Sequence, residues 1–296
     1  MSKKIFSSIL VLFIVINLVG CGNKAKKVVV ASKPMTEQYI LAEMITALIE
    51  SNTDIKVEKK LGIGGGTSNI QPAMLKGEID IYPEYTGTGW LFVLKKDLIK
   101  DPDKLYEEVK KEYLAKYHIK WLGLYGFNDT YALAIKKSVA AKLNINTYSD
   151  LASKSNRLKF GAEPDFYERE DGYKGLQKEY GFNFKEKREM DIGLKYEAIN
   201  SDNVDIINAF STDALLKKYD LKVIIDDKNF FPSYFATTLI REETLKKYPE
   251  LENVLNKLEG KIKDEEMTQM NYLVEKENKD PKDVAIEFLK GKGLLQ

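Results

Sequence analysis

The spacing of apolar and polar residues divides the chain into helix-like and strand-like segments. Between residues 36 and 49 the apolar side chains recur at the interval of one helical face: Ile40, Leu41, Met44, Ile45, Leu48 and Ile49. Thr36 is a suitable N-cap for this helix, and Glu37 lies favourably in its first turn. The pattern therefore predicts a helix that begins near residue 36.

Short runs rich in β-branched residues indicate strands. These runs are 27–31, 55–60, 78–81, 119–124, 132–135, 157–162, 202–210, 221–226 and 234–240. Roughly the last fifty residues are mostly helix-like, and Pro281, directly after Asp280, is placed to open the final helix. Strands that alternate with helices predict an α/β architecture with largely parallel sheets.

The N-terminus has the pattern of an export signal. Lys3 and Lys4 precede the apolar run 5–20, which ends at Cys21, the only cysteine. The letters LVGC at 18–21 resemble the bacterial lipobox, which implies cleavage before Cys21 and attachment of lipid to its thiol. We therefore expect a signal peptide at 1–20, a tether at 21–26 and a body held by lipid on the extracytoplasmic face of the bacterial cell membrane.

Length and composition add three limits to this picture. The length of 296 residues suggests about two domains. The 46 Lys and Arg residues nearly balance the 45 Asp and Glu residues, so the charge does not point to a nucleic-acid partner. One cysteine cannot build a disulfide framework.

Several motifs resemble parts of catalytic or cofactor-binding sites but lack the residues that such sites require. The glycine-rich 61–69 lacks the Lys-Ser/Thr ending of a P-loop and the spacing of a dinucleotide motif, so we interpret it as a turn that approaches a small ligand or starts a helix. His118 is the only histidine, which excludes a His/Cys metal site and a histidine-containing triad, and a structural or surface role is favoured. Asp226 and Asp227 precede KNFFP and are more typical of a turn than of acid–base catalysis. We expect no cofactor, no metal and no enzymatic activity.

Two distant segments have similar sequences, and we call this similarity the internal echo. EIDIYPEYTGT at 78–88 and NVDIINAFSTD at 203–213 align without gaps, so that Tyr85 corresponds to Phe210. Chance similarity over such a short stretch is an alternative. Two α/β lobes, however, would each place such a ring at the carboxyl end of a strand, where open sheets bind ligands.

Aromatic residues also recur at other predicted turns. Together with the echoed pair, Tyr131 and Tyr234 lie near strand ends, although each ring alone is more typical of packing. As a set, such rings suit a quaternary ammonium group, which has no N–H to donate and is held by ring faces.

Six ordered motifs over roughly 210 residues resemble the substrate-binding proteins of osmoprotectant ABC transporters, the glycine betaine/carnitine/choline-binding family. The motifs occupy residues 31–50, 61–90, 126–135, 160–182, 209–221 and 226–241. The resemblance implies a periplasmic-binding-protein-like (type II) fold of two α/β lobes, joined by two crossover segments, that close on the ligand. It implies lobe one at 27–127 and 236–296, and lobe two at 128–235. It also implies a permease and an ATPase as partners.

The resemblance assigns a candidate site residue by residue. The aromatic cage would comprise Tyr85, Tyr131, Phe210 and Tyr234. The ligand carboxylate would meet Lys33, Thr88 and Arg169. Members of the family commonly carry tyrosine where this chain has Phe210, so a hydroxyl is missing there.

Two cations at one site would suit a zwitterion such as glycine betaine, proline betaine or carnitine better than choline. For both Lys33 and Arg169 the alternative is an ordinary salt-bridge residue, and Glu168, Glu170 and Asp171 are near enough in sequence to neutralise Arg169. Other functions considered are a receptor for choline or another small cation, an exported enzyme acting on choline-like compounds, and a structural or adhesive surface lipoprotein.

Overall fold

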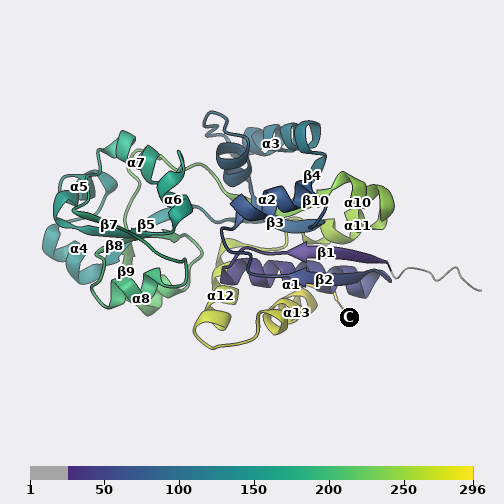
Figure 1. Ribbon diagram of the computed structural model, residues 1–296. Coiled ribbons are helices and arrows are strands. Elements are labelled where there is room, and N and C mark those ends of the chain that lie inside the picture. Colours follow the sequence, from purple (N-terminus) through teal and green to yellow (C-terminus); the bar gives the residue numbers. More distant parts are fainter. Residues whose placement is uncertain (1–25, 296) are drawn as a thin grey trace, which may run out of the picture.

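Two five-stranded sheets, each covered by helices, form two lobes that lie side by side (Figure 1). The computed structural model describes residues 26–295. The predicted signal peptide, the lipidation site Cys21 and most of the predicted tether lie outside the described residues. No helix within residues 26–295 is long and apolar enough to cross a membrane.

The first sheet has the strand order β2-β1-β3-β10-β4. Strand β1 runs parallel to β2 and β3, whereas β10 is antiparallel to both β3 and β4. The bounds are β1 Lys27–Ala31, β2 Lys56–Lys60, β3 Ile81–Tyr85, β4 Ile119–Asn128 and β10 Phe235–Arg241. The sheet therefore combines strands from both ends of the chain.

The second sheet repeats this arrangement with the order β7-β6-β8-β5-β9. Strand β6 is parallel to β7 and β8, and β5 is antiparallel to β8 and β9. The bounds are β5 Tyr131–Lys136, β6 Lys159–Ala162, β7 Glu186–Glu189, β8 Ile206–Phe210 and β9 Leu221–Val223. The α/β prediction is confirmed. In each sheet four of the five strands run in one direction, as expected, and one strand beside a crossover segment, β10 or β5, runs against its two neighbours.

Helices cover both faces of the first sheet. They are α1 Thr36–Asn52, α2 Thr67–Leu75, η1 Thr88–Val93, α3 Pro102–Tyr117, α10 Glu242–Lys247, α11 Glu250–Leu255, η3 Asn256–Leu258, α12 Asp264–Glu275 and α13 Pro281–Gly291. Val28 and Val30 of β1 pack in the cluster that includes α1, α12 and α13, whereas Ala31 packs in the opposite cluster with α2 and α3. This alternation is the period-2 pattern of a strand buried on both faces.

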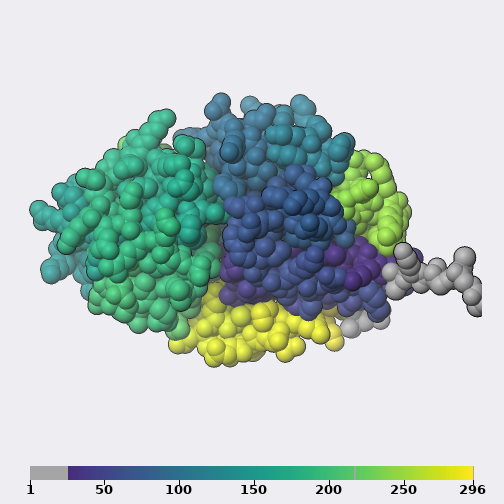
Figure 2. All heavy atoms as spheres, viewed as in Figure 1, coloured from purple at the N-terminus to yellow at the C-terminus, as the bar shows by residue number. Residues whose placement is uncertain are grey.

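The second lobe carries shorter helices. They are α4 Lys137–Leu143, α5 Tyr148–Ala152, η2 Ser155–Arg157, α6 Pro164–Glu168, α7 Tyr173–Tyr180, α8 Lys195–Asn200 and α9 Leu215–Lys218. Its core contains a chain of packed rings in which Phe160 stacks on Phe184 with centroids 4.9 Å apart. In Figure 2 the teal and green residues of this lobe press against the purple, blue and yellow residues of the first lobe.

Two predicted boundaries of helices can be compared with the structure. Thr36 is the first residue of α1 rather than its N-cap, which is Met35 and makes no side-chain capping bond. Pro281 opens α13 as predicted, and the Asp280 side chain caps the helix by accepting from the Lys282 amide at 2.8 Å.

The third strand begins where the sequence pattern predicted that it would end. The prediction covered 78–81, but β3 is Ile81–Tyr85 and pairs with β10 along its whole length. Tyr82 and Trp90 are buried in the cluster with α2 and α3. Tyr85 is buried as well, in the cluster with α1 on the other face of the sheet, so all three rings of this segment are part of the core of the lobe.

The chain crosses between the lobes twice. It leaves β4 and enters β5 through Asp129 and Thr130, and it returns to β10 past Tyr234. The two crossover segments are hydrogen-bonded to each other, because the Asp129 amide donates to the Tyr234 carbonyl (3.1 Å) and the Tyr234 amide donates to Asn128 Oδ1 (2.6 Å). This confirms the expected pair of crossovers.

Candidate ligand-binding site

A cavity of about 210 Å³ lies between the two lobes. Residues of β3, η1 and the loop before α1 line it from the first lobe, and residues of β5, β8 and the segment around α6 line it from the second. All seven side chains that the sequence singled out are part of its lining: Lys33, Tyr85, Thr88, Tyr131, Arg169, Phe210 and Tyr234. Their role in ligand binding stays a prediction.

The internal echo corresponds to equivalent positions in the two sheets. Tyr85 is the last residue of β3 and Phe210 the last of β8, and both strands lie beside one parallel and one antiparallel neighbour. The aspartate before each strand makes an equivalent contact, since Asp80 accepts from the Val29 amide of β1 and Asp205 accepts from the Lys159 amide of β6, both at 2.8 Å. The repeated sequence thus builds a repeated strand end that presents a ring to the cavity.

Three of the four predicted cage rings pack together. Tyr131, at the start of β5, has its ring centroid 5.1 Å from that of Phe210 and 5.3 Å from that of Tyr234. Tyr85 reaches the cavity from the other lobe, and its hydroxyl donates to Glu37 Oε1 at 2.6 Å and accepts from Gln38 at 3.1 Å. The rings therefore come from both lobes and from the second crossover segment.

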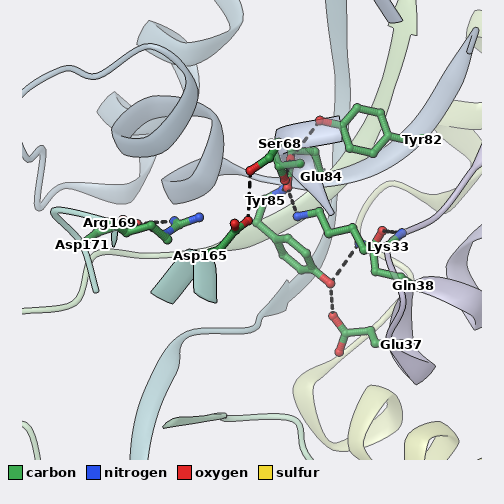
Figure 3. A network of polar contacts seen from close by, with 11 residues as sticks. Lys33, Glu37, Gln38, Ser68, Tyr82, Glu84, Tyr85, Asp165, Arg169 and Asp171 are labelled. Carbon is green, nitrogen blue, oxygen red and sulfur yellow. Dashed lines mark hydrogen bonds and ion pairs between the residues drawn. The ribbon is translucent and has the colours of Figure 1, made fainter. Parts of the chain in front are cut away.

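Lys33 is already paired with a carboxylate of the chain (Figure 3). Its Nζ lies 2.5 Å from Oε1 of Glu84, which is fully buried. Glu84 also accepts from the hydroxyls of Thr67 (2.7 Å) and Tyr82 (2.8 Å) and from the amide of Tyr85 (2.8 Å). Burial lowers the pKa of Lys33 below its usual value, and the Glu84 carboxylate opposes that shift.

Arg169 is paired as well. Its Nε donates to Asp171 Oδ1 at 2.8 Å and its Nη2 donates to Oδ2 of the same side chain, which also accepts from the Tyr234 hydroxyl at 2.6 Å. The guanidinium lies 4.8 Å from the ring centroid of Phe92 in η1 and 5.3 Å from that of Tyr131. Phe92 thus joins the first lobe to the cation of the second.

Sequence reasoning missed Glu84 as a site residue and Phe92 altogether. It named Asp171 only as a possible neutraliser of Arg169, which is the part that Asp171 takes. Glu84 stands in the recognised PEYTGT motif directly before the predicted cage residue Tyr85, and this acid could have been read as a partner for Lys33.

Four further carboxylates line the cavity: Asp129, Glu163, Asp165 and Asp191. Burial raises the pKa of Asp129 well above its usual range, with Glu37 adding to the shift. At the cavity rim the Ser68 hydroxyl of the first lobe donates to Asp165 Oδ2 of the second at 3.1 Å (Figure 3). Two cations that are already neutralised and four additional acids make this an acidic lining.

The residues to which the sequence analysis gave structural rather than catalytic roles occupy positions that fit those roles. His118 ends α3 in a left-handed conformation, is exposed, and contacts Glu242 through Nδ1 at 3.2 Å. Asp227 accepts from the Ser149 hydroxyl beside a turn. Gly65 and Gly66 line the cavity directly before α2, as predicted for a turn that starts a helix. Within residues 26–295 no group of three or more His, Cys, Asp or Glu side chains is arranged to hold a metal ion.

Two lobes that enclose a cavity between paired crossovers define the class of periplasmic-type substrate-binding proteins. Residues 26–291 match the family model described as the substrate-binding domain of ABC-type glycine betaine transport systems. The chain belongs to this family, which confirms the resemblance seen in the sequence.

Relatives and solved structures agree with this assignment. The chain is 49% identical over 269 residues to the ergothioneine transport permease/ergothioneine binding protein EgtU of Helicobacter pylori, covering 91% of this chain and 48% of that protein. It is 40% identical to the carnitine transport binding protein OpuCC of Listeria monocytogenes, covering 92% of this chain and 89% of that one. The chain thus spans about half the length of the first relative and most of the second.

The fold is also that of solved members. A crystal structure of a glycine betaine/carnitine/choline ABC transporter protein superposes with a TM-score of 0.71 at 36% identity, covering 92% of this chain and 99% of that one. The apo form of YehZ from Escherichia coli gives a TM-score of 0.64 at 29% identity, covering 91% and 100%. The two-lobed fold expected from the sequence is thereby confirmed.

Proposed function

We propose that the chain captures a quaternary ammonium osmoprotectant, namely glycine betaine, proline betaine or carnitine, between its lobes and delivers it to a membrane permease. The observation that carries this proposal is the cavity to which both lobes contribute aromatic rings. Four ring faces around a trimethylammonium group would each contribute about 0.5–2 kcal/mol, depending on how completely the cation is desolvated.

The carboxylate of such a zwitterion would meet Lys33, Thr88 and Arg169. Both cations have a partner in the chain, yet both keep donors for a ligand. The bidentate bond to Asp171 uses Nε and Nη2 of the guanidinium, so that the N–H groups on Nη1 remain. Lys33 carries three ammonium protons, of which the bond to Glu84 uses one.

The acidic lining favours a second candidate, a receptor for choline or another small cation in the same fold. Asp165 and Asp191, which form no ion pair within residues 26–295, would attract a ligand of net positive charge more than a zwitterion. The names of the two relatives add carnitine and ergothioneine to the compounds worth testing.

The remaining parts of the proposal concern the setting of the protein. We propose a lipid anchor at Cys21 after removal of residues 1–20, a location on the extracytoplasmic face of the cell membrane, and a permease and an ATPase as partners. We further propose that residues 27–127 and 236–296 move as one lobe and 128–235 as the other. The membership of the ten strands in two sheets supports this division. The chain would act without chemical turnover of its ligand.

A thermal-shift screen followed by titration calorimetry tests the proposal. The compounds are glycine betaine, proline betaine, carnitine, ergothioneine, choline and a set of amino acids. We expect quaternary ammonium compounds to raise the melting temperature, since a ligand that binds only the folded state stabilises it. Chromatography of the recovered ligand should show that it is chemically unchanged, whereas an enzyme would have converted it to a product. Stabilisation by amino acids alone, or by none of the compounds, would overturn the proposal.

A further inference from the structure

A second cavity, of about 260 Å³, lies next to the first between the same two lobes. The two cavities share four lining residues, which are Pro34, Met35, Ile192 and Phe210. Phe210, one of the predicted cage rings, thus faces both spaces. A ligand that contacts Phe210 in the first cavity is separated from the second cavity only by these shared residues.

The second cavity contains a buried cation without a hydrogen bond. Lys195, the first residue of α8, is 1% exposed, and its Nζ has no hydrogen-bond partner among residues 26–295. Its ion pair with Glu163 Oε2 spans 3.7 Å, which is too long for a hydrogen bond, and that oxygen lacks a partner as well. The ammonium lies 4.5 Å from the ring centroid of Phe210.

The opposite wall of this cavity offers acceptors. It belongs to α12 of the first lobe, where Oδ1 of Asn271 and Oε2 of Glu275 are buried and have no partner among the described residues. Asn271 is held in place by its amide nitrogen, which donates to the Thr212 carbonyl at 3.1 Å. A donor on one lobe and acceptors on the other therefore face one enclosed space.

Lys195 differs in this respect from the two cations of the first cavity. Lys33 has Glu84 and Arg169 has Asp171 at hydrogen-bond distance, whereas Lys195 makes no hydrogen bond within residues 26–295. Buried polar groups are almost always satisfied, by the protein, by ordered water or by a ligand. Leaving such a bond unmade costs stability, and the cost is larger for a charged group.

We propose that the second cavity is a subsite for the far end of the ligand. The inference rests on the proposed function, in which the trimethylammonium group lies among the rings of the first cavity. The group that the subsite takes would accept a hydrogen bond from Lys195 and donate one to Glu275 or Asn271. The chain would accordingly prefer quaternary ammonium compounds with a polar group several atoms beyond the nitrogen.

Two ligand chemistries fit this description, and one does not. Ergothioneine has a carboxylate beside its nitrogen for Lys33, Thr88 and Arg169, and a separate ring that combines N–H donors with a thione acceptor for the second cavity. Carnitine has a hydroxyl and a single distal carboxylate, so it fits only if that carboxylate enters the second cavity instead of meeting Lys33, Thr88 and Arg169. Glycine betaine carries its carboxylate on the carbon next to the nitrogen and has no further group to reach past Phe210. A site built to hydrogen-bond a ligand group discriminates strongly against an analogue that lacks the group, because the buried partners then stay unpaired.

Titration calorimetry on the mature protein tests the subsite. The probes are glycine betaine as the short ligand and the tighter-binding of carnitine and ergothioneine as the long one. The variant is Lys195→Met, which keeps most of the length of the side chain and removes its charge. Lys142→Met, at an exposed position on α4 of the same lobe, is the matched control.

We expect Lys195→Met to weaken the long ligand about tenfold or more, equivalent to about 1.4 kcal/mol, while glycine betaine changes less than about threefold. Lys142→Met should leave both affinities unchanged. Glu275→Gln is the second variant and should weaken the long ligand selectively, so it decides the matter if Lys195→Met does not fold.

The results separate this inference from the proposed function. If both ligands bind and the variants change neither, water alone fills the second cavity and the subsite is refuted. Equal weakening of both ligands refutes it too, since the effect is then not confined to the far end. Failure of every quaternary ammonium compound to bind the wild type would overturn the proposed function, and the subsite with it.

Discussion

Lys33 and Arg169 enter the cavity with their charge balanced by a buried carboxylate of the chain. Removing one partner of such a pair leaves the other charge buried and unpaired, which typically costs about 3–5 kcal/mol. Substitutions at these positions thus change stability and ligand binding together. The two effects are separated by comparing ligands on the same variant rather than by comparing variants.

Arg169→Ala is the variant that tests carboxylate recognition. If Arg169 contacts the ligand carboxylate, the variant should weaken glycine betaine more than choline and narrow the difference between them. Calorimetry with both ligands on the wild type and the variant gives this ratio, and Arg169→Ala/Asp171→Ala is the control in which no buried carboxylate is left unpaired. An unchanged ratio in both proteins would show that Arg169 does not read the carboxylate.

The cage predicts a different result at Tyr85 and Tyr234. Replacing either by Ala removes a ring face and should weaken betaine and choline alike, by about 1–2 kcal/mol or roughly tenfold. The Phe variants keep the ring but remove the hydroxyls that donate to Glu37 and Asp171. They should lower the melting temperature and change affinity little. Wild-type affinity in both Ala variants would remove the cage from the proposal.

The seven candidate side chains were found in the sequence because each stands in a recognisable motif. Lys195 was not, because a lysine in a short segment with a nearby glutamate, KYEAIN, is typical of a solvated helix surface. The acceptors that face it, Asn271 and Glu275 of α12, lie about 75 residues further along the chain and share a cavity with it only in the folded protein. The pairing of Lys33 with Glu84 was hidden for the same reason, since the two strand ends that carry them meet only in the sheet.

At the level of elements, the sequence predicted which segments pair into a lobe better than the direction in which they pair. The echo between 78–88 and 203–213 located two equivalent strand ends. In the structure β3 ends at Tyr85 and β8 ends at Phe210, the two residues that correspond in the echo. The direction of β5 and β10 was not predictable from periodicity, because a strand buried on both faces has the same apolar pattern in either direction. Only the crossovers determine that these strands run antiparallel.

One glycine fixes the approach of η1 to the cage. Gly87 has right-handed helical dihedrals, so alanine would meet no backbone strain, but a Cβ there would lie 2.5 Å from Cε1 of Tyr234 and 3.0 Å from the Ser233 carbonyl. Gly87→Ala should displace the Tyr234 ring and lower stability by about 1–3 kcal/mol. Affinity for betaine should fall although residue 87 is not itself in the cavity lining.

Gly64→Ala is the matched control for this substitution. Gly64 lies in the glycine-rich loop near the same cavity, and its added Cβ would meet no atom within 4 Å. Melting temperature and calorimetric affinity should therefore stay at the wild-type values. If Gly87→Ala also behaved like the wild type, the close packing of η1 against Tyr234 would have no part in shaping the site.

At the scale of the whole molecule, a buried hydroxyl joins the two lobes through two carboxyl groups. Thr212 of the second lobe lies 2.7 Å from Glu37 Oε2 in α1 and 2.8 Å from Asp129 Oδ1 in the first crossover segment. A hydroxyl has a single proton to donate, so both contacts are hydrogen bonds only when one of the carboxyl groups is protonated. Burial raises the pKa of Glu37 to about 7, against the opposing hydrogen bonds from Tyr85, Thr212 and Asn271.

This arrangement predicts that stability falls as the pH rises toward neutrality. A carboxyl group whose pKa is raised in the folded state binds its proton more tightly there than in the unfolded chain. Its contribution is complete below the ordinary value of 4.5 and is lost as the pH rises to about 7. Burial also raises the pKa of Glu275 to about 7, and this group adds to the effect with the same sign. Carboxylates with a lowered pKa, such as Asp54 and Glu58, titrate below this window and do not oppose it.

Denaturant unfolding at pH 5, 6, 7 and 8 measures the effect. The free energy of unfolding of the wild type should decrease over this range, by an amount on the order of 2 kcal/mol for Glu37 alone. Glu37→Gln keeps the carbonyl acceptor for Thr212 and cannot ionise, so its pH dependence should be shallower. Glu37→Gln/Glu275→Gln should be shallower still, with a remaining slope from Asp129 and Asp213, whose pKa values burial also raises. Because the Glu37–Thr212 contact joins the lobes, ligand should also dissociate faster from the wild type at pH 8 than at pH 6. A wild-type stability that rises with pH, or a Glu37→Gln variant with the same slope, would contradict the assignment of the shared proton to this contact.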